Sequence, residues 1–281
     1  MRTSRVLICG RQRLSLNHPL VMGIVNVTPD SFADGGRYVA AGAALAHVRA
    51  LLGDGADIID IGGESTRPGA EPVSEQQELD RVLPLVEQLR AECDERAVPI
   101  SVDTRKPVVM RAAIAAGASM INDVGALQSY GALQVVADNV MPVAVCLMHL
   151  RGEPATMQQA VVYGDVVADV ADFLRARIAA CLAAGIGRER IVVDPGFGFG
   201  KTVEQNLELL RRLQEIVALG YPVLVGLSRK STIGALTGRD VGERMAGSVA
   251  AALAAVARGA AIVRVHDVRE TVDALKIWRA I

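Results

Sequence analysis

The chain has 281 residues, with 30 Lys and Arg against 31 Asp and Glu, 51% apolar residues and 3% aromatic residues. This length suits a single α/β barrel, which takes about 250 residues. The apolar half of the composition indicates a large buried core and argues against disorder. A formal net charge of −1 argues against a protein that holds a nucleic-acid backbone.

The remaining composition signals point to a cytoplasmic protein. The first residues contain no apolar stretch long enough for a signal peptide, and the most apolar later stretch, 247–257, is too short to cross a bilayer. Four cysteines stand far apart without a CxxC motif, so neither a zinc cage nor a disulfide framework is expected. We therefore expect no membrane and no nucleic acid among the partners.

A repeated unit runs along the chain: an amphipathic stretch rich in Ala and Leu, a glycine, and a short apolar run that ends in a polar residue. Runs of this kind occur at residues 21–26, 57–61, 99–103, 120–123, 143–148, 191–194, 223–227 and 261–265. Helical patterns separate most of them, at 75–93, 166–184, 203–219 and 245–258, with a shorter helix expected at 131–139.

Eight alternating strand and helix units predict a single (β/α)8 TIM barrel rather than a doubly wound sheet. In this interpretation residues 21–281 form the barrel, and residues 1–20 form a short N-terminal hairpin or plug that packs on it. Helix starts are marked by capping boxes at Ser74 and Thr202 and by Pro107 at a first helical position.

Polar side chains follow all eight predicted strands, and in such barrels the active site forms at these carboxyl ends. For one residue, a polar strand end means only that the chain has reached water. A set that mixes carboxylates, amides and cations instead predicts a binding site. Its principal members are Asn26, Asp103, Asn122, Asp123, Met148, His149, Asp194, Ser228, Lys230, Arg264 and His266.

This set has a chemical logic. Carboxylate acceptors, an amide and a cation are supplied by Asp103, Asn122, Asp194 and Lys230. These groups suit a flat heterocycle that carries N–H donors and a carbonyl. Arg264 and His266 are two residues apart on one strand, so they face the same way and form a small cationic site for a phosphate. Asn26, or acidic residues near it, could hold Mg2+, which uses few protein ligands.

Three glycine-rich segments follow strands. Residues 26–36 and 62–69 are long for turns in a compact barrel and predict lids or binding loops. Residues 196–202 resemble a phosphate-binding loop, but one residue is missing from GxxxxGK[ST], and Lys201 replaces the last glycine of GxGxxG. We interpret this segment as a strand-to-helix turn that approaches a ligand, with Phe199 free to line a pocket.

Eight motifs in order along the chain carry a family resemblance. They are NVTPDSF (26–32), GGESTRPGA (62–70), SVDTRKP (101–107), MINDV (120–124), LMH (147–149), DPGFGFGK (194–201), SRKS (228–231) and RVHDV (264–268). This set resembles that of the dihydropteroate synthases and touches every predicted strand end.

The resemblance implies a homodimeric TIM-barrel enzyme of folate biosynthesis and a sulfonamide target. Such a transferase joins 6-hydroxymethyl-7,8-dihydropterin diphosphate to p-aminobenzoate and releases pyrophosphate and 7,8-dihydropteroate, with Mg2+ as cofactor. It also implies roles for single positions. Asp103, Asn122, Asp194 and Lys230 would bind the pterin ring with Met148 in the pocket wall, Arg264 would stack on the pterin, and Arg264 and His266 would bind the diphosphate. Asn26 would be the Mg2+ ligand, and the p-aminobenzoate site would be shaped by Thr66, Arg67, Pro68, Phe199 and Ser231.

The expected mechanism begins with loss of pyrophosphate, which leaves a delocalised cation on the dihydropterin. Mg2+, Arg264 and His266 would stabilise the charge on the leaving group, while Asp103 and Asp194 would stabilise the cation. The neutral amine of p-aminobenzoate would then attack while the closed loops exclude water. The sequence leaves open which group accepts the amine proton and whether Asp60 and Asp123 belong to the site.

Two other functions fit the same barrel. One is a pterin-binding methyltransferase domain that uses methyltetrahydrofolate and a corrinoid partner, although such a domain has no use for the diphosphate site of Arg264 and His266. The other is a pterin-binding paralogue without turnover. That hypothesis calls for a lost site residue, and the sequence shows none.

Overall fold

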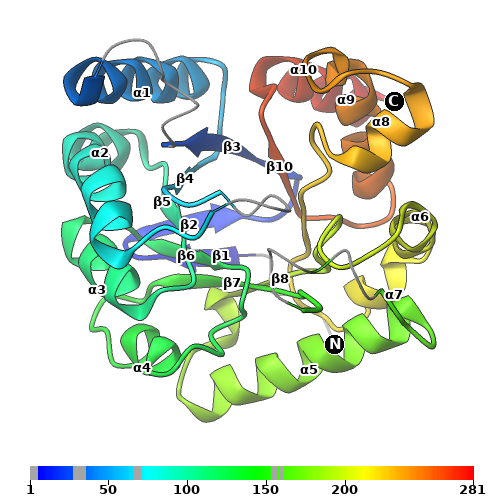
Figure 1. Ribbon diagram of the computed structural model, residues 1–281, viewed down its shortest axis with the longest axis horizontal. Coiled ribbons are helices and arrows are strands. Elements are labelled where there is room, and N and C mark those ends of the chain that lie inside the picture. The colour runs from blue at the N-terminus through cyan, green and yellow to red at the C-terminus, as the bar shows by residue number, and fades with distance from the viewer. Residues whose placement is uncertain (1–5, 28–35, 66–70, 153–156, 158–160) are drawn as a thin grey trace.

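A computed structural model describes residues 6–27, 36–65, 71–152, 157 and 161–281 (Figure 1). Within these residues, eight parallel strands form one sheet. They are β3 (Leu20–Asn26), β4 (Ile58–Gly62), β5 (Ile100–Asp103), β6 (Met120–Asp123), β7 (Ala144–Met148), β8 (Ile191–Asp194), β9 (Leu224–Val225) and β10 (Ile262–Val265). The strand order is β8-β7-β6-β5-β4-β3-β10-β9, and a parallel bridge between Val193 and Val223 joins the two ends. The predicted TIM barrel is confirmed.

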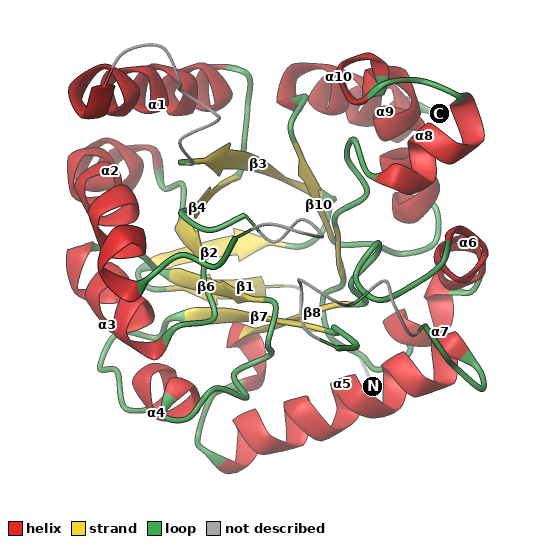
Figure 2. Cartoon of the chain, in the orientation of Figure 1, coloured by secondary structure: helices red, strands yellow, loops and turns green. Residues whose placement is uncertain are grey.

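Helices surround the barrel (Figure 2). They are α1 (Gly36–Gly53), α2 (Glu75–Arg96), α3 (Pro107–Ala116), α4 (Ala132–Ala137), α5 (Val166–Ala183), α6 (Val203–Arg211), α7 (Leu213–Val217), α8 (Ser231–Thr237), α9 (Met245–Val256) and α10 (Val268–Ala280), with short 3-10 turns η2 (Arg188–Arg190) and η3 (Val241–Glu243). No helix in the described ranges is both long and apolar enough to span a membrane.

The helix starts follow the sequence closely. The Ser74 hydroxyl accepts the N–H of Gln77, and the Gln77 side chain accepts the N–H of Ser74. Thr202 and Gln205 form the same reciprocal pair at α6. Both predicted capping boxes are therefore confirmed.

Two element boundaries differ from the sequence prediction. The helix expected over 203–219 is broken at Arg212, whose φ of −102° and ψ of 20° lie outside helical values, so α6 and α7 are separate. The strand expected over 223–227 keeps only two paired residues in β9. The spacing of apolar residues predicts which face of a helix or strand is buried, but it does not predict where the backbone changes direction.

Alternation along the strands divides the barrel interior into an apolar part and a polar part. In β4, Ile58 packs in the interior apolar cluster and Asp60 follows two residues later. In β6, Met120 and Asn122 repeat this arrangement. Because side chains two apart in a strand face the same way, the polar members gather at the carboxyl ends.

An antiparallel hairpin of β1 (Val6–Cys9) and β2 (Gln12–Ser15) packs against the apolar part of the interior. Leu7 and Cys9 are fully buried in one cluster with Leu20 and Met22 of β3. The N–H of Gly10 in the hairpin turn donates to the carbonyl of Pro142, just before β7 begins, and β1 contacts η2, just before β8. The hairpin therefore covers the end of the barrel where the strands begin, and in Figure 1 β1 and β2 lie within the ring of helices.

Met120→Ala should show how much the interior contributes. Met120 is fully buried, and truncation of such a side chain costs about 2–5 kcal/mol because it loses apolar contact and leaves a cavity. Met141, which is 38% exposed, supplies a matched Met→Ala control with an expected cost below about 1 kcal/mol. Urea denaturation measures both values, and equal costs would contradict the described core.

Candidate active site

Arg264 of β10 links carboxylates from two other strands at the polar end of the barrel. Its Nε donates to Asp60 Oδ2 at 2.6 Å, and its Nη2 donates to Asp103 Oδ2 at 2.9 Å. The side-chain amide of Asn122 also donates to Asp60 Oδ2, at 3.1 Å. Side chains from β4, β5, β6 and β10 thus form one hydrogen-bonded network.

Asp194 and Lys230 lie on the other side of this network. Asp194 ends β8 and accepts the N–H of Gly196 at 2.7 Å. Lys230 follows β9; its ammonium donates to the carbonyl of Phe197 and lies 4.5 Å from the centre of the Phe199 ring. The charges of Asp194 and Arg264 both act on Lys230, which places these groups at one site.

Burial shifts the ionisation of these groups. It raises the pKa of Asp103 to about 7, against the opposing charge of Arg264 and with support from the negative charge of Asp60. It raises the pKa of Asp194 as well, and it lowers the pKa of Lys230 to about 8. Asp103 and Lys230 thus have pKa values near neutrality, which is typical of functional sites.

The structure gives Asp60 and Asp123 different surroundings and so answers which of the two belongs to the network. Asp60 is fully buried within the network. Asp123 instead accepts the N–H groups of Gly125 and Leu127, both at 2.7 Å, and holds a turn beside the barrel. The alternation that places Asn122 inside β6 could have found Asp60, since Asp60 stands two residues after Ile58 of the interior cluster.

Three further predicted residues, Asn26, Met148 and Ser231, lie at or after the ends of β3, β7 and β9. Asn26 ends β3. Its Oδ1 and the Oδ2 of Asp103 lie 3.9 Å and 4.0 Å from the position that a Cβ at Gly62 would occupy, so both side chains lie beside Gly62. Met148 is buried at the end of β7 and pairs in register with Asp194. Ser231 begins α8.

Three of the predicted residues, Thr66, Arg67 and Pro68, lie outside the described residues. His266 directly follows Val265, the last residue of β10, which is also where the predicted strand ended. Its Nδ1 lies 3.0 Å from the Ser228 hydroxyl, which links it to the segment after β9.

A buried ion network that the sequence did not indicate holds the segment after β4. Lys106 donates to Glu64 at 2.9 Å and to the fully buried Glu78 at 2.6 Å. Glu64 also accepts the N–H of Val73 at 3.1 Å. One carboxylate therefore ties together the two ends of segment 64–73. The sequence shows that these side chains are charged but not which of them pair, so this network could not be predicted from the sequence.

The segment that resembles a phosphate loop is a turn between β8 and α6. The ammonium of Lys201 donates to the carbonyls of Gly196 and Phe199 and contacts His149, and Lys201 is 2% exposed. Lys201 therefore holds the turn itself instead of presenting a cation to solvent.

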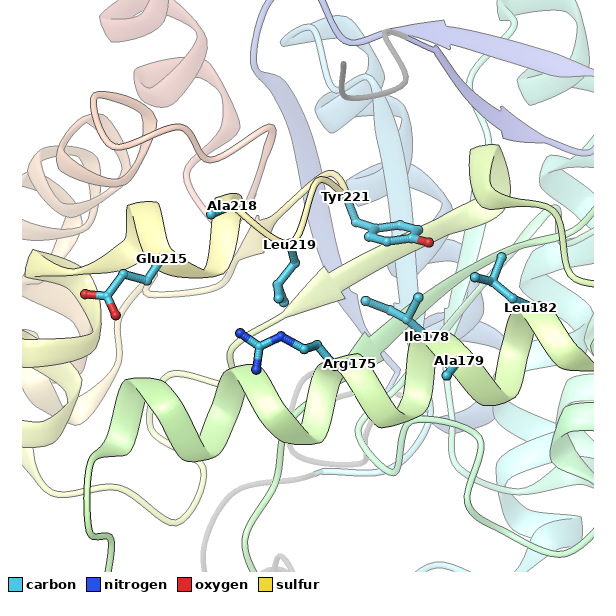
Figure 3. A pocket seen from close by; sticks show the side chains of 8 residues that line it. All are labelled: Arg175, Ile178, Ala179, Leu182, Glu215, Ala218, Leu219 and Tyr221. Carbon is cyan, nitrogen blue, oxygen red and sulfur yellow. The ribbon is translucent and has the colours of Figure 1, made fainter. Parts of the chain in front are cut away.

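A groove of about 350 Å³ lies outside the barrel, between α5 and α7 (Figure 3). It is lined by Arg175, Ile178, Ala179, Leu182, Glu215, Ala218, Leu219 and Tyr221. None of the strand-end residues is among them, so the groove is separate from the candidate site.

Asn26 is compatible with a magnesium ion that arrives with a phosphate ligand. A single amide oxygen fits an ion that keeps most of its water and takes its other ligands from a diphosphate. Among the residues that the structure describes, no group of three His, Cys, Asp or Glu side chains could hold a metal by itself.

Comparison with known proteins agrees with this geometry. The sequence profile of the pterin binding enzyme family matches residues 22–266. A dihydropteroate synthase of Neisseria meningitidis serogroup B is 54% identical over 97% of this chain and 96% of its own.

Solved structures agree as well. The dihydropteroate synthase of Xanthomonas albilineans with 4-aminobenzoic acid has a TM-score of 0.92 and 55% identity, over 99% of this chain and 98% of its own. The same enzyme in complex with 7,8-dihydropteroate has a TM-score of 0.87 and 52% identity, over 98% of both chains. The chain belongs to the pterin binding enzymes and, within them, to the dihydropteroate synthases.

The raised pKa of Asp103 predicts a dependence of stability on pH. Its folded-state pKa of about 7 lies above the ordinary 3.8, so the folded state holds this proton more tightly than the unfolded chain does. The free energy of unfolding should therefore fall as pH rises from about 4 to about 7. Asp103→Asn should reduce this fall by about 3–4 kcal/mol, since each unit of pKa shift corresponds to about 1.4 kcal/mol.

Urea denaturation across that pH range gives the measurement. Asp172→Asn is the matched control, because the Asp172 side chain is 74% exposed. A variant at Asp103 with the same pH dependence as the wild type would show that its carboxyl is not perturbed by burial.

Proposed function

We propose that the protein condenses 6-hydroxymethyl-7,8-dihydropterin diphosphate with p-aminobenzoate to give 7,8-dihydropteroate and pyrophosphate. One observation carries the proposal: the network of Asp60, Asp103, Asn122 and Arg264 meets Asp194 and Lys230 at the open end of the barrel. Membership of the dihydropteroate synthases supports the same reaction.

The dihydropterin ring is bound by groups that match its edge. Carboxylates of Asp103 and Asp194 accept its N–H groups, the Asn122 amide offers both a donor and an acceptor, and Lys230 donates to the ring carbonyl or a ring nitrogen. Met148 supplies an apolar wall. The buried setting strengthens each polar contact, because water does not compete for it.

The diphosphate is held by the cationic side of the site. Arg264 stacks on the pterin and, with His266, binds the phosphate oxygens. When bound through Asn26, Mg2+ supplies further positive charge to the leaving pyrophosphate. Arg264 is held by Asp60 and Asp103 before the ligand arrives, so its guanidinium needs little reorganisation.

The chain stabilises separating charge in this reaction and needs no nucleophile of its own. As the bond between the methylene carbon and the diphosphate oxygen breaks, Arg264 and His266 stabilise the anion, while Asp103 and Asp194 stabilise the cationic ring. The p-aminobenzoate amine then forms the new C–N bond and loses a proton. Phe199 and Ser231 shape the space for p-aminobenzoate and exclude water.

The methyltransferase alternative is not favoured. Relatives that match nearly the whole chain are dihydropteroate synthases. The structure also keeps the cation of Arg264 at the site, for which a methyl donor without a diphosphate has no use.

A pyrophosphate-release assay tests the proposal. The protein, the pterin diphosphate, p-aminobenzoate and Mg2+ should give pyrophosphate and dihydropteroate in equal amounts, and a chelator should suppress both. Absence of product under these conditions would contradict the function. Binding of methyltetrahydrofolate without binding of the pterin diphosphate would favour the methyltransferase.

Lys230→Ala is the matched site variant for this assay, since it removes the cation beside Asp194. It should weaken pterin binding at least about tenfold, because a hydrogen bond to a charged group contributes about 1.5–3 kcal/mol. Lys276→Ala, at a 67% exposed position, should leave binding unchanged.

We also propose that the protein is a homodimer located in the cytoplasm. Exposed apolar side chains occur on α8, η3, α9 and α10, and α9 contacts both α8 and α10: Leu236, Val241, Met245, Ile277 and Trp278. Exposed apolar side chains on elements that pack together are typical of an interaction surface. The four buried, unpaired cysteines suit a reducing compartment.

Analytical ultracentrifugation tests the dimer. The wild type should sediment at twice the chain mass, and Trp278→Glu should shift it toward the monomer because a buried charge would destabilise the interface. A monomeric wild type at micromolar concentration would contradict the proposal.

A further inference from the structure

Lys201 is a second buried cation close to the candidate site, and its surroundings are unusual. Its ammonium donates to the carbonyls of Gly196 at 2.8 Å and Phe199 at 3.1 Å, and it lies 3.0 Å from Nδ1 of His149. An ammonium has three N–H donors, so these three contacts use all of them. All three partners are neutral, although a buried charge ordinarily requires a partner of opposite charge.

The neutrality of His149 follows from its position. An ammonium has no acceptor, so Nδ1 of His149 is the acceptor in this pair. Burial is the main cause that lowers the pKa of His149 to about 3, and the positive charges of Lys201 and Arg151 add to this effect. The ring also packs edge-on against Phe173, with centroids 5.0 Å apart. His149 therefore stays neutral at physiological pH.

Gly196 connects Lys201 to Asp194. Its carbonyl accepts from Lys201, and its N–H donates to Asp194 Oδ1 at 2.7 Å. Gly196 has a φ of +70°, and a Cβ there would strike the carbonyl oxygen of His149. The conformation that orients this N–H toward Asp194 is thus reserved for glycine.

The charge of Lys201 also acts on Asp194 directly. Burial raises the pKa of Asp194, and the cations that oppose this rise are Lys230, Lys201 and Arg264. Burial lowers the pKa of Lys201 to about 7; the charge of Asp194 works against this effect, and those of Lys230 and Arg151 add to it. The two groups therefore influence each other near neutral pH.

We propose that Lys201 is a positioning residue for the pterin site, which acts through Asp194. It holds the turn of residues 196–200, and its charge keeps Asp194 in the ionised form that accepts the N–H groups of the dihydropterin. This inference rests on the proposed function. Lys201 touches no substrate, yet its charge determines whether Asp194 is ionised when the site binds its ligand.

A purely structural lysine and a positioning lysine give different pH profiles. If Lys201 only holds the turn, replacing it weakens the pterin site equally at every pH. If its charge sustains ionised Asp194, the loss is largest at low pH, where Asp194 is protonated more readily. The loss then shrinks above about pH 8, where wild-type Lys201 has itself given up its proton.

Lys201→Met and Lys201→Gln supply the test. Gln keeps an N–H donor for the turn without the charge, so it serves as the second variant if Met disturbs folding, and circular dichroism establishes that each variant is folded. Calorimetry measures the dissociation constant of 6-hydroxymethyl-7,8-dihydropterin between about pH 6 and pH 8.5. We expect the loss of affinity to be about tenfold larger at the acid end than at the alkaline end, the size of one lost hydrogen bond to a charged group. A loss that remains at the alkaline end reports the turn that Lys201 holds.

Asp194→Asn provides the control for the route of action. On this background the effect of the Lys201→Met change on affinity should no longer depend on pH, because the titrating group is gone. A loss of affinity that is independent of pH, an unchanged affinity, or a loss that still depends on pH on the Asp194→Asn background would overturn the inference. A wild-type protein that binds no dihydropterin at any pH would contradict the proposed function as well, which separates the two failures.

Discussion

The site depends on one constraint: a guanidinium buried at the carboxyl end of a barrel needs negative partners. Arg264 has them in Asp60 and Asp103, which come from strands far away in sequence. Each lies inside the barrel because alternate residues of a strand face the same way. Closure of the sheet between β8 and β9 brings Asp194 and Lys230 to the same end. The ion network therefore depends on the closed sheet.

Burial determines the chemistry as much as the identity of the side chains. Asp103, Lys230 and Lys201 have pKa values of about 7, 8 and 7 because the charged form of each has lost its water. The hairpin of β1 and β2 contributes from a distance, since Leu7 and Cys9 exclude water from the opposite end of the interior. A plug made of apolar residues thus helps to maintain the electrostatics of a polar site.

Much of the fold and part of the site could be predicted from the sequence. The strand ends could be predicted because each apolar run leads to a polar residue, as at Asp103, Asn122 and Asp194. The reciprocal cap at Ser74 could be predicted because it involves only two residues three positions apart. Other features depend on long-range packing. Asp60 and Asp123 are both acidic residues within predicted strands, but one pairs with Arg264 and the other caps a turn. The direction of a long side chain such as Lys201 is fixed by His149, which lies 52 positions away.

The turn between β8 and α6 restricts how this family can vary. Gly196, Gly198 and Gly200 all have positive φ, and any side chain at Gly196 or Gly200 would collide with the main chain of residues 149–151. Main-chain atoms cannot rotate away as a side chain does, so compensation by a second substitution is hard to achieve. Within this turn, Phe197 is fully buried, which leaves Phe199 as the position where a new side chain could alter the pocket without striking the main chain.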